Sequence, residues 1–150
     1  MGGTDSERDK AALERAAMES LESLAFAEAM PEAAPQGFPA GMDCAAAVIP
    51  VDAGGGLALW VERKFLRGIA ATLFTLPEAQ VDAAMLQDAL LEFLNIVAGR
   101  FMAMDDRADR VMTLGLPRAL PEGTGMSGYP VALFFRTEPE GCFAVGVKAS

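Results

Sequence analysis

QDALLEFLNIVAGR (residues 87–100) is the stretch that decides the fold, because its pattern is that of a long amphipathic helix. With about 100° of rotation per residue, Asp88, Glu92 and Asn95 fall within one narrow arc. The opposite side is apolar and is expected to face the core; it comprises Leu86, Leu90, Phe93, Leu94, Val97 and Phe101. Asn95 is the only asparagine in the 150 residues. The polar arc is therefore the first place to look for function.

Gly99 falls in the same arc, and Asp88, Glu92, Asn95 and Gly99 are called the polar stripe from here on. Apolar residues border the stripe, namely Met85, Leu91 and Ile96. An outward helix face with apolar borders is typical of a docking surface, although acidic residues and amides are also ordinary on a solvent face. Asn95 and Gly99 together disfavour the helix by roughly 1–2 kcal/mol relative to alanine. Such departures from local preference tend to mark functional sites.

Length and composition predict one domain, residues 1–150, because a chain with 52% hydrophobic residues can build a substantial core. No apolar run is long enough to span a membrane. The net charge of −9 leaves no basic surface for nucleic acid or for an anionic membrane. The chain shows no secretory signal, and its cysteines, Cys44 and Cys142, are expected to fill small core positions. We therefore expect a cytoplasmic protein without nucleic-acid or membrane partners.

Histidine is absent from the sequence, which excludes serine–histidine and cysteine–histidine nucleophile pairs and histidine metal sites. Any catalysis must use carboxylates, amides, arginine or groups of a partner. The glycine-rich turn at 53–56 lacks the Lys-Ser/Thr that follows in a phosphate-binding loop. The acidic bend at 105–109 lacks the alternating ligands and the central glycine of a calcium loop, so no metal site is predicted.

The N-terminal half is predicted to contain one helix and two strands. Residues 1–10 are expected to be disordered, apart from a helix-start signal at Ser6 and Asp9, after which apolar residues repeat at helical spacing to about Met30. Prolines and glycines at 31–41 predict a connecting loop. The runs 42–51 and 57–63 flank the glycine turn and predict an antiparallel pair of strands.

The C-terminal half is predicted to contain two helices and then three strands. The helices are expected at 65–74 and at about 78–104. Strands are expected at 111–116, 129–137 and 142–148, the last two joined by a turn at 138–141. This order predicts an α+β fold (α/β in looser schemes), an antiparallel sheet covered on one face by two long helices and a shorter one.

The polar stripe also carries a family resemblance. The pattern Asp88-x-x-x-Glu92-x-x-Asn95, continued by Ile-Val-Ala-Gly at 96–99 and by Leu-Pro at 116–117, resembles the signature of the CheX-like chemotaxis phosphatases and of the related CheC and FliY proteins. The resemblance covers roughly residues 42–150. An isolated Glu-x-x-Asn is unspecific, whereas the preceding acid, the following glycine and the later Leu-Pro make the combination more specific.

The resemblance implies a phosphatase that removes the phosphoryl group from the aspartyl phosphate of a CheY-like response regulator. Asn95 would position the attacking water, and Glu92 would pair with the lysine beside the partner's phosphorylated aspartate. The residues implied to contact the partner are Asp88, Leu91, Ile96 and Gly99. The chain would need no cofactor of its own, because Mg²⁺ is expected on the partner receiver domain.

The single Glu-x-x-Asn site favours the CheX-like branch, whose members form homodimers, so the resemblance also implies a homodimer. Arg100 follows Gly99 and has two readings, a salt bridge to the partner or a cap on the solvent side of the helix. A non-catalytic alternative is also open. In that case the same helix would bind a response regulator or a flagellar or signalling component without hydrolysis.

Overall fold

The computed structural model describes residues 2–39, 41–51, 55–104, 114–138 and 140–148. The helical elements are α1 (Gly2–Ala25), α2 (Arg63–Phe74), the 3-10 turn η1 (Glu78–Gln80) and α3 (Ala83–Ala103). The strands are β1 (Glu28–Glu32), β2 (Cys44–Val51), β3 (Gly55–Glu62), β4 (Arg118–Ala119), β5 (Val131–Glu138) and β6 (Gly141–Lys148).

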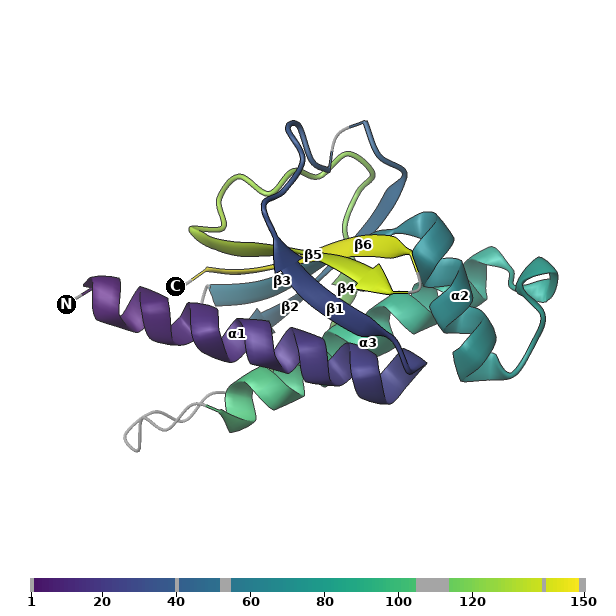
Figure 1. Cartoon of the computed structure of the whole chain (residues 1–150), viewed down its shortest axis with the longest axis horizontal. Helices are drawn as coiled ribbons and strands as arrows, with labels where there is room; N and C mark the ends of the chain where they lie inside the picture. Colours follow the sequence, from purple (N-terminus) through teal and green to yellow (C-terminus); the bar gives the residue numbers. More distant parts are fainter. Residues whose placement is uncertain (1, 40, 52–54, 105–113, 139, 149–150) are drawn as a thin grey trace.

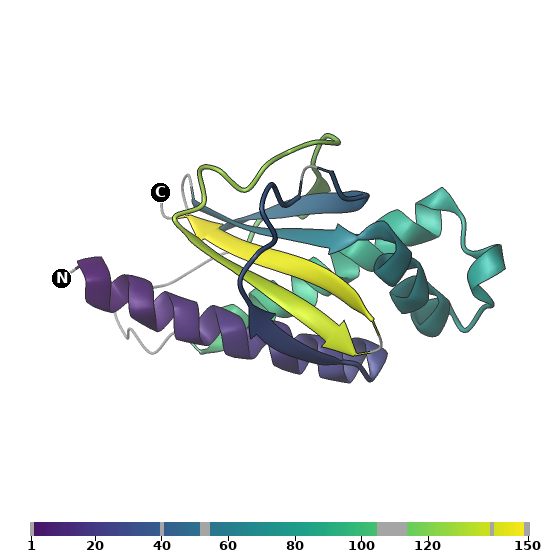
Figure 2. The ribbon, with the colours of Figure 1, turned by 45° about the horizontal axis from the view of Figure 1, so that its top comes forward.

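The strands form one antiparallel sheet in the order β1-β5-β6-β3-β2-β4. The three α-helices lie on one face of this sheet, with α1 and α3 side by side (Figures 1 and 2). The predicted α+β class and the one-sided helical cover are therefore confirmed. The predicted strands 42–51, 57–63, 129–137 and 142–148 correspond to β2, β3, β5 and β6, within a few residues at their ends.

Both faces of the sheet are apolar, as alternation along β3 illustrates. Leu57, Leu59 and Val61 belong to the core under the helices, whereas Trp60 belongs to a smaller core on the other face. That second core is covered by side chains from the loops that precede β2 and β5, namely Phe38, Met42, Leu120, Met126 and Tyr129. The Trp60 indole N–H donates to the carbonyl oxygen of Thr124 at 3.0 Å, which fixes one of these loops.

α3 begins later than the sequence pattern predicts. The carboxylate of Asp82 accepts a hydrogen bond from the Met85 backbone N–H at 2.9 Å and so caps the first turn. Asp82 itself is extended, with φ −95° and ψ 178°, and it separates η1 from α3. The predicted helix at 78–104 is thus a short turn followed by a capped helix that starts at Ala83.

The N-terminal predictions differ most from the structure. α1 starts at Gly2, whereas disorder was expected for residues 1–10. Glu7, Arg8 and Lys10 are good helix formers, which favours this longer helix. The helix ends at Ala25 rather than near Met30, because Phe26 adopts φ 54°. The chain then forms β1, which was not predicted.

β1 occupies the first two positions of the predicted 31–41 loop. Pro31 fits there because β1 is an edge strand, and prolines within sheets occur mainly in edge strands. The predicted bend at 105–109 and residues 111–113 of the predicted strand 111–116 lie outside the described residues. Leu114 makes a single bridge to Val51, and Leu116 is exposed. Among the helices that the structure describes, none combines the length and apolar character needed to cross a bilayer.

Candidate functional site

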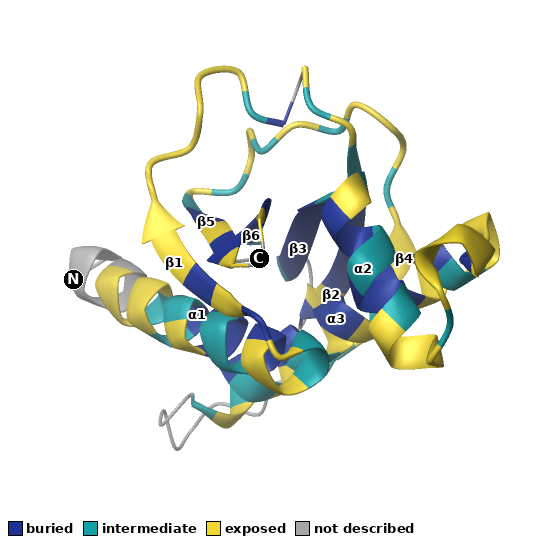
Figure 3. Ribbon diagram, turned by 45° about the vertical axis from the view of Figure 1, so that its right-hand side comes forward, coloured by how far each residue is buried: buried dark blue, intermediate teal, exposed yellow. Residues whose placement is uncertain are grey.

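The structure places the whole polar stripe on the outer side of α3. Asp88, Glu92, Asn95 and Gly99 are all exposed, and the positions between them are buried or half-buried. Figure 3 shows this mixture of buried and exposed positions along α3. The apolar neighbours Leu91 and Ile96, which were also predicted to contact the partner, are half-buried along the borders of the stripe. The geometry expected from the sequence is therefore present, while the roles of these residues remain predictions.

The functional groups of the stripe have no partner among the described residues. Within the part of the chain that the structure describes, no hydrogen bond or ion pair engages the side chains of Asp88, Glu92 or Asn95. The inner side of α3 is by contrast fully used, since it packs against α1, α2, β2 and β3. A rigid helix thus presents two carboxylates and one amide to whatever approaches from outside.

Arg100 lies at the end of the stripe and turns toward α1. Its Nη2 donates to the Ser23 hydroxyl at 3.1 Å, and its Nη1 lies 3.8 Å from a carboxylate oxygen of Glu19. Glu19 also pairs with Arg15 at 3.1 Å, one helical turn earlier. Neither of the two predicted readings describes this side chain, because it joins the two neighbouring helices instead.

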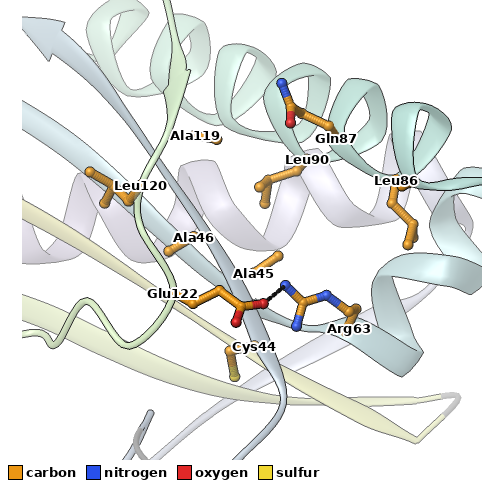
Figure 4. A pocket seen from close by; sticks show the side chains of 11 residues that line it. Cys44, Ala45, Ala46, Arg63, Leu86, Gln87, Leu90, Ala119, Leu120 and Glu122 are labelled. Carbon is orange, nitrogen blue, oxygen red and sulfur yellow. Dashed lines mark hydrogen bonds and ion pairs between the residues drawn. The ribbon is translucent and has the colours of Figure 1, made fainter.

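A cavity of about 270 Å³ lies on the other side of α3, and the sequence did not predict it (Figure 4). Its lining comes from β2, the start of α2, α3 and the segment around β4, so no local motif marks it. Among the described residues that line it, Arg63 is the only cation, and its guanidinium is bound by the carboxylates of Asp43 and, at 3.2 Å, Glu122. Because this charge is already neutralised, the cavity offers no site for an anion.

The thiols near this cavity are chemically quiet. Burial raises the pKa of the Cys44 thiol to about 12, and the neighbouring Cys142, Glu62 and Asp43 add to the rise. Burial also raises the pKa of the Cys142 thiol. A protonated thiol is neither a nucleophile nor a metal ligand, so both cysteines act as packing residues, with Cys142 buried and Cys44 half-buried.

Solved structures of chemotaxis proteins share this fold. A CheX from Desulfovibrio desulfuricans matches 95% of this chain and 99% of its own length, with a TM-score of 0.73 at 14% identity. The CheX of a Borrelia burgdorferi complex, described as CheX-CheY-BeF3-Mg²⁺, matches 92% of this chain and 96% of its own length, with a TM-score of 0.71 at 17% identity. A CheX from Vibrio vulnificus matches 91% and 94%, with a TM-score of 0.69 at 14% identity.

These matches establish that the chain has the fold of CheX and CheC-like chemotaxis proteins. No protein-family model matches the sequence, and no curated protein matches it either. The likeness is one of fold, so the activity has to be argued from the residues of α3.

Proposed function

We propose that this protein hydrolyses the aspartyl phosphate of a CheY-like response regulator. The single observation that carries the proposal is the exposed pair Glu92 and Asn95, which has no partner among the described residues and lies on a packed helix of a CheX-like fold. The Borrelia burgdorferi CheX of the same fold is described in a complex with CheY, which supports this class of partner.

Asn95 is the group that we assign to the reacting water. A carboxamide both donates and accepts hydrogen bonds, and it needs no change of protonation near neutral pH. Its amide can therefore hold a water in line with the bond between phosphorus and the departing aspartyl oxygen. That bond breaks as the water oxygen attacks, and inorganic phosphate and the free aspartate of the receiver are released.

Glu92 is the group that we assign to docking. Its carboxylate would pair with the receiver lysine beside the phosphorylated aspartate, which would fix the helix at the distance that Asn95 requires. Asp88, Leu91 and Ile96 would extend this contact along α3. The Mg²⁺ that neutralises phosphoryl oxygens would belong to the receiver, so this chain supplies positioning rather than metal ligands. The homodimer implied by the family resemblance is likewise part of this proposal.

The test is the decay of a phosphorylated receiver in the presence of sub-stoichiometric protein. CheY-like receivers from the same genome are phosphorylated with a small phosphodonor, and the lifetime of the phosphoryl group is followed. We expect the wild-type protein to shorten this lifetime and Asn95→Ala to lose the effect while complex formation persists, because alanine cannot orient the water.

The assay separates the proposal from the non-catalytic alternative. A wild-type protein that binds a receiver but leaves its phosphoryl lifetime unchanged would be a binding module. A wild-type protein that binds none of the receivers in calorimetry would exclude both the phosphatase and a receiver-binding module, and would leave only a flagellar or signalling component as the partner.

A further inference from the structure

Gly99 is the residue of the polar stripe that the fold itself does not explain. It lies in the interior of α3, where glycine is the least favourable residue apart from proline. A Cβ added there would meet no atom within 4 Å outside the adjacent turns of the helix. Neither packing against the described residues nor the backbone conformation therefore requires a glycine at position 99.

Gly68 in α2 is a helical glycine for which a neighbouring residue of the same chain explains the missing side chain. A Cβ added at Gly68 would lie 3.1 Å from the Glu78 carboxylate oxygen, so a neighbouring element already occupies that space. The space above Gly99 is open to solvent instead. No described residue therefore gives a reason for the missing side chain, and a partner is the reason left to consider.

The lengths of the side chains along the stripe indicate where a partner can approach the helix most closely. Gly99 follows Asn95 by one turn, roughly 6 Å along the axis, within the same arc. Side-chain length falls from Glu92 to Asn95 and then to Gly99, which has none. A flat surface resting on these residues would approach the helix backbone most closely at Gly99.

We propose that Gly99 is a specificity-determining contact, at which the main chain of the phosphorylated receiver packs directly on the α3 backbone. This inference rests on the proposed function and deepens it. The short Asn95 amide can reach a phosphorus atom only if the next turn of the helix does not hold the two proteins apart. Arg100 supports the arrangement, because it turns to Ser23 and Glu19 on α1 and leaves the space above Gly99 clear.

The experiment measures stability, receiver affinity and phosphoryl lifetime for Gly99→Ala and Gly99→Leu. Gly99→Ala is expected to raise the midpoint of thermal unfolding by about 2–4 °C, because alanine favours the helix. We expect affinity to fall with side-chain size, by at least about tenfold for Gly99→Leu, because overpacking an interface commonly costs this much. The matched controls are Gly68→Ala, a helical glycine outside the stripe, and Gln87→Leu, an exposed residue of α3 about 100° away from Asp88.

The outcomes separate this inference from the proposed function. If the wild-type protein accelerates decay and both Gly99 variants bind and act as it does, the inference is wrong and the proposed function stands. If the wild-type protein binds without hydrolysis and Gly99→Leu loses binding, the contact is supported and the phosphatase activity is not. Loss of affinity in Gln87→Leu equal to that in Gly99→Leu would also overturn the inference, since any added leucine would then suffice.

Discussion

The helices α1 and α3 lie side by side and use similar residues for opposite purposes (Figure 1). Each carries a glutamate followed three residues later by a polar residue, Glu19 and Glu22 in α1 and Glu92 and Asn95 in α3. Glu19 is engaged by Arg15 and Arg100, whereas Glu92 has no internal partner among the described residues. Residue type alone therefore does not identify a site. The side chain must also be free to bind a partner.

The buried sides of the two helices differ as well. α1 buries small residues such as Ala16, Ala17 and Ser20 together with a few leucines, whereas α3 buries large ones such as Phe93 and Leu94. The Phe93 ring also meets Phe143 of β6 at a centroid distance of 5.3 Å. α3 is thus held by the larger apolar contacts, as the proposed role of Asn95 in positioning a water requires.

The largest expected effect comes from making α3 resemble α1. Asn95→Glu converts the pair into the Glu-x-x-Glu of α1, and we expect it to reduce the acceleration of receiver dephosphorylation by about 100-fold or more. The carboxylate cannot donate a hydrogen bond and repels the phosphoryl oxygens. Phosphoryl lifetime with excess variant is the measurement.

The reverse exchange tests the same comparison from the other side. Glu22→Asn gives α1 a Glu-x-x-Asn, and we expect it to leave an Asn95→Ala protein inactive, because Glu19 is already engaged by two arginines. Recovery of activity in that double variant would mean that availability of the glutamate is not what separates the helices.

A smaller effect is expected from reversing the charge of each glutamate. Glu92→Lys should weaken receiver binding by about tenfold with little change in stability, because the proposed docking places this position against a lysine of the receiver. Glu19→Lys should lower the free energy of unfolding by only about 0.5 kcal/mol, since its ion pairs with Arg15 and Arg100 are more than a third exposed. Titration calorimetry and urea unfolding measure the two quantities. Equal loss of receiver affinity in both variants would contradict the division of roles.

Much of this arrangement could be predicted from local sequence patterns. The apolar period of 87–100 identified α3, and the same period identified its outer face, because a helix core imposes its spacing on the sequence directly. β1 escaped prediction because Ala29 is its only buried residue and it has the composition of a helix end. The end of α1 could not be predicted either. The residue with positive φ that follows the helix is usually a glycine, whereas here it is Phe26, with φ 54°.

Contacts between distant segments could not be predicted in the same way. The turn of Arg100 toward Ser23 and Glu19 depends on how α1 crosses α3, and the second core around Trp60 depends on loops far apart in the chain. The open space above Gly99 likewise depends on how distant segments pack around α3. The sequence could mark this glycine as unfavourable in a helix, but only the packed structure excludes an internal neighbour as its reason.

The smallest expected effect concerns the buried side of α1. The hydroxyl of Ser20 is fully buried, and no hydrogen-bond partner for it occurs in the described part of the chain. Ser20→Ala removes this unsatisfied group without creating a large cavity, so we expect it to stabilise the fold by up to about 1 kcal/mol and to leave phosphoryl lifetimes unchanged. Urea unfolding measures the first quantity and the decay assay the second. A slower decay reaction in this variant would show that small changes in the seating of α1 reach the stripe through Arg100, and the two helices would then have to be treated as one functional unit.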